Sequence, residues 1–485
     1  MAIEILDVGA EQADYLHDES RREGHADQIA FPRTTEEVCE ALRMAAENGW
    51  PVTVQGGRTG ITGGCVPEGG LILNLSRMAA FGQIAGDRLT VQPGATLAEI
   101  RNATEGSGRF FPSDLTETSA TIGGMVANNA SGARSFKYGA VRNWVHALEV
   151  VLPHGEPVRL ERGVHRACGN VFNLGSVSGN LCAHLRKCAQ VKNAAGYFME
   201  PDMDLVDLFI GAEGTLGVVT EIEIMLLPKP GQMNGLTAFF DAEERALEFV
   251  RFLRGAGRLP RPVAIEFFDS RALALLRKMK EEYPAFGDLP ALAPEFDTAL
   301  YFEFDCEVPD AVAEEIDRRA IDCWLSEGEK EIGILKNFRH AIPESVNLII
   351  GERKRAIPGL TKLGTDMAVP DDRLEAVMRM YHEGLAQAGL EYVIFGHIGN
   401  NHVHVNILPR SLAEHDRGQA LYLDWAKQVV AWNGSVSAEH GIGKNKTAFL
   451  ALMYGAEGVA GMRAIKRLFD PAGRLNPGNL FGNGN

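Results

Sequence analysis

A histidine-rich segment in the C-terminal part of the chain carries residue types that could act on a bound ligand. It reads GHIGNNHVHVNI and is followed, further along, by SAEHGIGKNK. On a strand, residues two apart share a face, so His402, His404 and Asn406 would point one way, and His397 could fold back toward them across the GNN turn. These imidazoles and the Glu439 carboxylate suit a divalent ion such as zinc or manganese. A hydrogen-bonded polar strand that binds no metal accounts for the same residues equally well.

A second candidate for chemistry is a glycine loop that directly follows the short predicted strand PVTVQ. In the loop GGRTGITGG, successive backbone amides could form a nest for a phosphate. The loop lacks the G-x-G-x-x-G spacing and following helix of a dinucleotide fingerprint, and it lacks the Gly-Lys-Ser/Thr of a P-loop. A tight turn without a ligand is the alternative. Two further glycine segments, SATIGGMVANNASGARSFKYG and IGAEGTLGVVTE, favour a large cofactor.

Composition bounds the class of protein and its partners. The chain has 485 residues, of which 45% are hydrophobic, which is enough for roughly three domains. Its formal net charge of -16 argues against nucleic acid or an anionic membrane as the main partner, although a small anionic substrate stays compatible. The N-terminal residues show no secretory signal, and no stretch approaches the ~20 apolar residues of a transmembrane helix. Seven scattered cysteines do not suggest a disulfide framework, so we expect a cytoplasmic protein.

The pattern of apolar residues predicts an α+β protein with two differently composed halves. TTEEVCEALRMAAENG predicts a helix at 34–49, which Thr34 would cap and Gly49 would end. A Pro-Lys-Pro-Gly run at 228–231 indicates a domain boundary. Beyond it, charged amphipathic helices alternate with strands such as TALYFEFDCE and EYVIFGHIG. This pattern predicts a second domain with an antiparallel sheet and helices on one of its faces.

The glycine segments, taken in their order, resemble those of a known family. PVTVQGGRTGITGGCVPEGGLILNLSRM, TIGGMVANNASG and FIGAEGTLGVVTEI are similar to the FAD-wrapping segments of flavoenzymes of the vanillyl-alcohol-oxidase type, which have a PCMH-type FAD domain. The resemblance covers almost the whole chain. It implies a two-part FAD-binding domain at 1–228, an α+β substrate-binding cap domain with an antiparallel sheet and the metal-ligand strand at 229–430, and a C-terminal helical segment at 431–485. This last segment carries the Glu-His loop and would pack back on the FAD domain.

The resemblance also implies which residues hold the cofactor. The loop after the first strand has no histidine for a covalent link, so we expect non-covalent FAD. Residues 56–60 would hold the pyrophosphate, and the later segments would line the ribityl chain and the ring. The predicted cofactor-binding residues are Gly56, Gly57, Arg58, Thr59, Gly60, Ser119, Gly123, Gly124, Asn129, Gly132, Gly214, Gly217, Val219 and Asn476.

Within this family, the histidine segment is similar to that of the branch that oxidises D-2-hydroxy acids: D-lactate, glycolate and D-2-hydroxyglutarate dehydrogenases. The resemblance implies that His397 and His404 ligate a divalent metal, zinc or manganese. SAEHGIG resembles the segment that supplies a third ligand, here Glu439, and then a catalytic base, here His440.

One departure from the family pattern concerns the turn before the metal-ligand strand. The usual segment carries Asp-Gly-Asn where this chain has Asn400, Asn401 and His402. His402 could be an extra ligand, a residue that orients a ligand, or part of the pocket wall.

The resemblance further implies three substrate-binding residues: Arg339, Asn406 and Thr365. The Arg339 guanidinium would pair with the substrate carboxylate, and a surface arginine at the start of a helix is the alternative. D-2-hydroxyglutarate enzymes carry a lysine two residues before Asp366, where this chain has Gly364, and Lys362 lies further along the predicted strand. We therefore expect a small monocarboxylate, with D-lactate as the first choice and glycolate as the next.

These roles together predict oxidation of a small D-2-hydroxy acid to the 2-oxo acid. A metal lowers the pKa of the hydroxyl group, His440 takes its proton, and the α-hydrogen leaves as hydride to FAD. No nicotinamide site is visible, so the expected electron acceptor is an electron-transfer flavoprotein, an iron–sulfur protein or a quinone. Such an acceptor could place the protein peripherally at the inner membrane.

Two other classes of protein compete with this reading. An alkylglycerone-phosphate-synthase-like flavoenzyme would not need the metal-ligand set. A flavin subunit of an oxidase complex would be expected to lose the C-terminal metal half, which this chain keeps. Neither class is excluded by composition, and a homodimer is compatible with all three.

Overall fold

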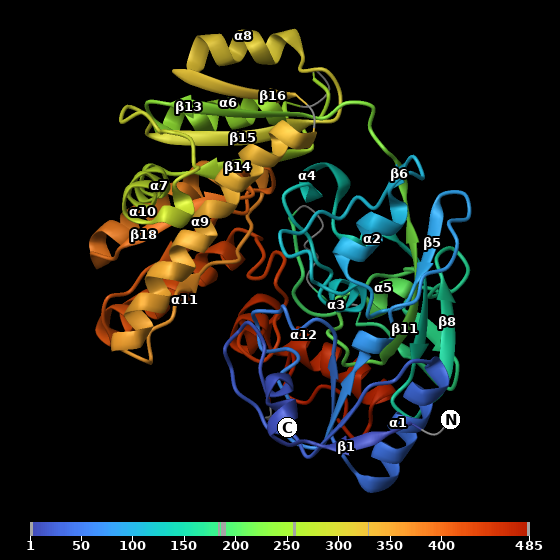
Figure 1. Cartoon of the computed structure of the whole chain (residues 1–485). Helices are drawn as coiled ribbons and strands as arrows, with labels where there is room; N and C mark the ends of the chain where they lie inside the picture. Colours follow the sequence, from blue (N-terminus) through green and yellow to red (C-terminus); the bar gives the residue numbers. More distant parts are fainter. Residues whose placement is uncertain (1–2, 183–184, 186–190, 256–258, 328, 483–485) are drawn as a thin grey trace.

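The structure is a computed structural model that describes residues 3–182, 185, 191–255, 259–327 and 329–482. Figure 1 shows an N-terminal body, a second body built around a large sheet, and the C-terminal helix α12 lying against the first body.

The N-terminal domain begins with a four-stranded sheet in the order β1-β2-β4-β3. β2, β4 and β3 run parallel, and β1 is antiparallel to β2. The strands are β1 (Ile5–Asp7), β2 (Gln28–Ala30), β3 (Val52–Gln55) and β4 (Leu71–Asn74). The glycine loop follows β3 directly, so this sheet fixes where the loop begins.

Helix α1 (Thr35–Asn48) packs its buried face, which includes Val38 and Leu42, into the core beside this sheet. The Thr34 side chain accepts a hydrogen bond from the Glu37 amide at its start. Gly49 adopts a left-handed conformation at its end, with φ of 69°. The predicted helix and both of its end signals are therefore confirmed.

The second part of the N-terminal domain is a four-stranded antiparallel sheet in the order β5-β11-β7-β8. Short helices and two-stranded ribbons surround it. The strands are β5 (Arg88–Val91), β6 (Arg109–Phe110), β7 (Val145–Val151), β8 (Pro157–Glu161), β9 (Val171–Leu174), β10 (Val177–Asn180), β11 (Val218–Met225) and β12 (Leu227–Pro228). The helices are α2 (Leu97–Thr104), α3 (Ile122–Ala127), α4 (Ser135–Tyr138) and α5 (Val206–Phe209).

The second domain is built on a seven-stranded antiparallel sheet in the order β16-β13-β15-β14-β18-β19-β17. Its strands are β13 (Asn234–Phe240), β14 (Ala264–Phe268), β15 (Thr298–Phe304), β16 (Asp322–Glu327), β17 (Leu363–Gly364), β18 (Tyr392–Gly396) and β19 (His404–Ile407). Its helices are α6 (Glu243–Arg254), α7 (Ser270–Glu282), α8 (Asp310–Arg319), α9 (Glu329–Ala356), α10 (Leu374–Ala388) and α11 (Leu412–Ala431).

The expectation that helices cover only one face of this sheet is wrong. Every residue of β13, β14 and β15 is buried. On one face, Phe268 of β14 meets Phe338 of α9, and on the opposite face Phe302 of β15 meets Phe249 of α6 (Figure 1). The nearly uninterrupted apolar runs of these strands, such as AIEFF, are typical of strands that are buried on both faces.

The C-terminal segment joins the N-terminal domain. Helix α12 (Thr447–Phe469) is interrupted at Gly455 and ends where Phe469 stacks on Phe172 and meets the edge of Phe209. Beyond the helix, the chain pairs with β3 through a parallel bridge between Leu475 and Val52. A segment near the C-terminus therefore pairs with strand β3 of the N-terminal domain.

Ion pairs join the two domains directly. Arg134 Nε, next to α4, lies 2.7 Å from Glu303 Oε2 of β15, and Lys137 Nζ lies 2.6 Å from Asp305 Oδ1. Glu303 is almost fully buried, so its carboxylate is held by a charged partner in a low-dielectric environment.

Within the described part of the chain, no helix is long and apolar enough to cross a membrane. The cysteines whose placement is described are all free thiols, and Cys188 lies outside the described residues.

We expect Phe469→Ala to destabilise the protein by about 3–5 kcal/mol, because it removes the ring that docks α12 onto Phe172 and Phe209. Denaturant unfolding followed by fluorescence and circular dichroism measures the change. The control is Arg467→Ala, an exposed residue of the same helical turn, with an expected change of about 0.5 kcal/mol or less. Equal effects of the two substitutions would contradict the docking role of the ring.

Candidate active site

A cavity of about 480 Å³ is lined by residues of both domains and of the C-terminal segment. Its walls bring together most of the predicted site residues: Gly56, Gly57, Arg58, Thr59, Gly60, Gly123, Gly124, Gly132, Gly214, Gly217, Val219, Arg339, Thr365, His397, His404, Asn406, Glu439, His440 and Asn476. Ser119 and Asn129 are outside the lining, but their neighbours in sequence belong to it.

The glycine loop presents bare backbone to this cavity. A Cβ atom at Gly56 would lie 2.3 Å from Thr121 Oγ1, and one at Gly57 would lie 2.9 Å from Ser119 O. The Gly57 amide donates a hydrogen bond of 3.2 Å to Thr121 Oγ1. At Gly60 no atom lies within 4 Å of the added Cβ position, so that side of the loop is open. The loop is thus packed from behind and open in front, which fits a cofactor phosphate against backbone amides.

Two predicted cofactor residues use their side chains to hold the protein together. Asn476 accepts a hydrogen bond from the Val54 amide at 2.7 Å and donates one to Glu213 O at 2.6 Å. Asn129 accepts from the Arg142 amide and donates to Asn193 O. The side-chain amide groups of both residues are therefore already used within the protein. A contact between either side chain and FAD would have to share or replace one of these hydrogen bonds.

The predicted metal ligands converge in the lining of the cavity. Glu439 Oε1 lies 3.3 Å from His397 Nε2 and 3.3 Å from His404 Nε2. Donors that share a tetrahedral ion at ~2.1 Å are separated by about 3.4 Å, so this set fits a zinc-type ion. Together with a nitrogen of His402, these ligand atoms all lie within 4.8 Å of one another.

Each of the two histidines predicted as ligands is held through its other ring nitrogen, Nδ1. His397 Nδ1 lies 2.6 Å from Glu266 Oε1, and His404 Nδ1 lies 2.9 Å from the carbonyl oxygen of Thr365. A ring nitrogen that donates to oxygen leaves the other nitrogen free to ligate, and partners of this kind orient metal ligands in proteins. Thr365 therefore acts here through its backbone, while its hydroxyl accepts a hydrogen bond from the Val405 amide.

Charged neighbours shift the pKa values of the cluster. Burial lowers the pKa of His397, but Glu266 and Glu439 outweigh it and raise the value to about 9. Burial would raise the pKa of Glu439, yet Lys192 and His397 hold it well below its ordinary range. Burial and the nearby His404 instead hold the pKa of His402 well below its ordinary value. The cluster therefore places an ionised Glu439 carboxylate beside one imidazole, His397, whose positive charge is favoured by its carboxylate neighbours.

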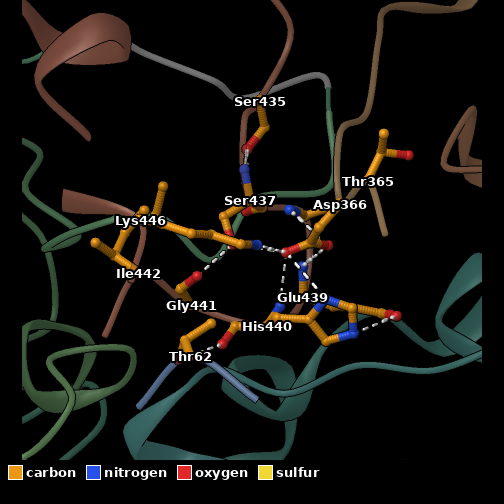
Figure 2. A network of polar contacts seen from close by, with 12 residues as sticks. Thr62, Thr365, Asp366, Ser435, Ser437, Glu439, His440, Gly441, Ile442 and Lys446 are labelled. Atoms are coloured by element: carbon orange, nitrogen blue, oxygen red, sulfur yellow. Dashed lines mark hydrogen bonds and ion pairs between the residues drawn. The ribbon is translucent and has the colours of Figure 1, made fainter. Parts of the chain in front are cut away.

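His440 belongs to a network centred on the buried carboxylate of Asp366 (Figure 2). Its Nδ1 lies 3.2 Å from Asp366 Oδ2, and its Nε2 lies 3.6 Å from Glu439 Oε1. The Asp366 carboxylate also accepts hydrogen bonds from the amides of 438–440, the Ser437 hydroxyl and Lys446 Nζ. The backbone of the loop that carries Glu439 and His440 is thus hydrogen-bonded to the carboxylate of one aspartate.

The same loop is held from the other side by the N-terminal domain. The Glu213 carboxylate accepts hydrogen bonds from the amides of Ile442 and Gly443 at 2.7 and 2.8 Å. Glu213 itself precedes Gly214 of the third glycine segment. The cofactor segment and the Glu-His loop are therefore joined by direct hydrogen bonds.

Arg339 lies inside helix α9 rather than at its start, with only 11% of its side chain exposed. Its guanidinium lies 3.7 Å from Glu266 Oε2 and contacts the ring of His340. The alternative of a surface arginine at a helix start is therefore wrong. Lys362 also lines the cavity and donates to Asn347 Oδ1 at 2.8 Å.

Two polar residues of the site, Glu266 and Lys192, and the central position of Asp366 in its hydrogen-bond network were not predicted from the sequence. Glu266 had a signal, because it is the one acidic residue in the apolar strand AIEFF, and a buried charge requires a partner. Lys192 Nζ lies 2.6 Å from Glu439 Oε2 and 3.4 Å from His402 Nδ1, although the two segments are far apart in sequence. Nothing in the local sequence around Lys192 indicates this contact.

Comparison with known proteins places this architecture in a family. The family described as "FAD linked oxidases, C-terminal domain" matches residues 229–480, and the one described as "FAD binding domain" matches residues 26–161. The D-lactate dehydrogenase of Archaeoglobus fulgidus is 31% identical over 93% of this chain and 90% of its own length. The D-2-hydroxyglutarate dehydrogenase of Xanthomonas citri pv. viticola is 31% identical over 93% and 89%, and the glycolate oxidase subunit GlcD of Bacillus subtilis is 29% identical over 94% and 89%.

A solved structure of alkyldihydroxyacetonephosphate synthase matches with a TM-score of 0.65 and covers 98% of this chain and 82% of its own, at 14% identity. That likeness concerns the fold alone. The chain belongs to the family of FAD-linked oxidases, with a PCMH-type FAD-binding domain followed by the family's C-terminal domain. The predicted fold class, the predicted family and the prediction of FAD as cofactor are confirmed.

We expect Asp366→Asn to destabilise the fold by about 3–5 kcal/mol, because it leaves Lys446 and the donors of 437–440 without their buried anion. Neighbouring His440 and Lys446 outweigh burial and hold the pKa of Asp366 well below its ordinary value. This stabilisation is therefore fully present above about pH 5, begins to fall near ~3.9, the pKa of an unfolded-state aspartate, and is lost as the pH falls further through the lower pKa of the folded state. Thermal unfolding at several pH values measures both effects.

The matched control is Asp372→Asn, whose side chain is 69% exposed. A change of about 0.5 kcal/mol or less is expected there. A comparable loss in the two variants would show that the Asp366 network does not stabilise the loop.

Proposed function

We propose that this protein oxidises a small D-2-hydroxy acid to the 2-oxo acid, with non-covalently bound FAD as hydride acceptor and a divalent cation, zinc or manganese, held by His397, His404 and Glu439. The observation that carries the proposal is the convergence of Glu439 Oε1 with His397 Nε2, His404 Nε2 and His440 Nε2 in the cavity that the glycine segments line. D-lactate is the preferred substrate, and glycolate and D-2-hydroxyglutarate are the alternatives.

When bound, FAD supplies the two-electron acceptor and the cation supplies a positive charge that favours the ionised hydroxyl group of the substrate. His440 Nε2 faces the cavity and takes the hydroxyl proton, while Asp366 fixes the ring through Nδ1 and stabilises the imidazolium that forms. Arg339 pairs with the substrate carboxylate, and Asn406 and Thr365 border the same volume. The glycine segments exclude side chains from the cofactor cradle and leave backbone amides for its phosphates.

Charge balance supports an anionic substrate. Three buried carboxylates each have a cationic side chain nearby: Glu266 with Arg339, Glu439 with Lys192, and Asp366 with Lys446. The charges of these three carboxylates and three cationic side chains therefore cancel. A bound dication would then give the cavity a net positive charge. A 2-hydroxy carboxylate complements that charge.

We further propose that the reduced flavin passes its electrons to an electron-transfer flavoprotein, an iron–sulfur protein or a quinone. The support is the lack of a nicotinamide fingerprint in the sequence. Such an acceptor is compatible with a cytoplasmic protein. It is also compatible with a protein that lies peripherally at the inner membrane.

Anaerobic bleaching of the oxidised flavin tests the reaction class and the substrate together. The purified protein meets D-lactate, L-lactate, glycolate and D-2-hydroxyglutarate, each with and without EDTA. We expect rapid bleaching by D-lactate, loss of bleaching after chelation, and recovery when zinc or manganese is added. A flavin that none of the four acids reduces would overturn the proposed reaction, and reduction that EDTA leaves unchanged would overturn the role of the cation.

We expect His440→Asn to slow flavin reduction by about 10²–10⁴-fold while FAD and cation stay bound, because the variant lacks the proton acceptor. Stopped-flow absorbance and metal analysis measure rate and loading on the same sample. His154→Asn, an exposed histidine of the N-terminal domain, serves as the control and should keep the wild-type rate. Reduction of the His440→Asn flavin at the wild-type rate would remove His440 from the reaction.

A further inference from the structure

A buried lysine, Lys192, contacts the proposed cation site, and the sequence predicts no role for it. Lys192 has only 6% of its side chain exposed, and its Nζ lies 2.6 Å from Glu439 Oε2 and 3.4 Å from His402 Nδ1. The two oxygens of Glu439 therefore face different partners: Oε1 faces the Nε2 atoms of His397 and His404, and Oε2 faces the lysine.

The contacts of His402 fix which of its nitrogens carries the proton. A lysine ammonium has only donors, so His402 Nδ1 must accept from Lys192. The proton then sits on Nε2, which lies 3.2 Å from Asp366 Oδ1. The one free lone pair of this fully buried, neutral ring is then on Nδ1, where Lys192 contacts it, and it is not free for a metal, while Nε2 lies beside the Asp366 carboxylate.

We propose that Lys192 is a positioning residue that sets the ligand number of the cation site. It holds Glu439 Oε2 and the Nδ1 of His402, so that the protein offers three ligand atoms, His397 Nε2, His404 Nε2 and Glu439 Oε1, and His402 stays outside the set. The inference rests on the proposed function, since it requires that a divalent cation binds here.

The consequence is an open coordination sphere. Three histidines and a glutamate would form a closed four-ligand site, which is the arrangement of structural zinc sites, whereas catalytic sites keep three protein ligands and an open position. Lys192 therefore reserves that position for oxygens of the substrate. Its charge also weakens the pull of Glu439 on the cation, which leaves the cation a stronger acceptor for substrate oxygen.

Cobalt(II) is the probe for the test, because its visible bands report the number and geometry of ligands. The FAD-loaded enzyme is stripped with a chelator and reloaded with cobalt, and the bands are read beyond the absorbance of the oxidised flavin. The variants are His402→Asn, Lys192→Met, the double variant Lys192→Met/His402→Asn, and His404→Asn as the example of a lost ligand.

We expect His402→Asn to bind cobalt with the wild-type spectrum, and His404→Asn to lose cobalt or change its bands. In Lys192→Met, the released Nδ1 of His402 joins the site, so the bands shift and weaken, and the double variant returns to the wild-type spectrum. A changed spectrum in His402→Asn alone would overturn the proposal, as would a wild-type spectrum in Lys192→Met.

Folding of the variants and cobalt binding by the wild-type enzyme are measured alongside the spectra. If Lys192→Met does not fold, as judged by its FAD content, His402→Asn still decides whether His402 is a ligand. A wild-type enzyme that binds no cobalt and is bleached despite chelation would overturn the proposed cation and this inference together. Cobalt binding with a changed His402→Asn spectrum would overturn the inference alone.

Discussion

The site depends on one buried carboxylate. Asp366 is fully enclosed and accepts hydrogen bonds from three consecutive backbone amides, a hydroxyl and a lysine, while two imidazoles lie against its oxygens. An anion in such an environment is stable only when its partners are all present, so it selects one conformation of the loop around it. That conformation directs Glu439 and His440 into the cavity. The position of both side chains in the cavity wall is therefore an electrostatic consequence of a residue that lies outside the lining.

The second constraint is that the Glu-His loop belongs to both domains at once. Asp366 holds it beside the second sheet, and Glu213 holds its next turn beside the third glycine segment. The glycine segments and the His397–His404–Glu439 cluster come from sequence segments far apart, but this loop connects them through a few short hydrogen bonds. The third glycine segment and the His397–His404–Glu439 cluster are in this way held relative to each other by hydrogen bonds to backbone amides rather than by flexible side chains.

Sequence patterns predicted what is local and missed what is not. The helix at 35–48, the strands beside the glycine loops and the alternation in VHVNI are carried by neighbouring residues, and all of them are found. The second helical layer was missed, because a period of two and a run of apolar residues both occur in TALYFEF. The contacts of Lys192 with Glu439 and of Glu266 with His397 span 247 and 131 residues, and no periodicity encodes such a pair. His402 could be named as a candidate from its position, but its contact with Lys192, 210 residues earlier, could not be predicted.

The tie between Asn476 and Val54 has a consequence for how the protein is made. β3 is an edge strand of its sheet, and the amide of Val54 within it is satisfied by a side chain 422 residues later in the chain. A nascent chain on the ribosome therefore displays this edge uncovered throughout translation of the second domain, which is the situation in which strands find wrong partners. The cavity that the glycine segments line gains its last wall, which includes Asn476 and Asn479, only when synthesis of the chain is almost complete.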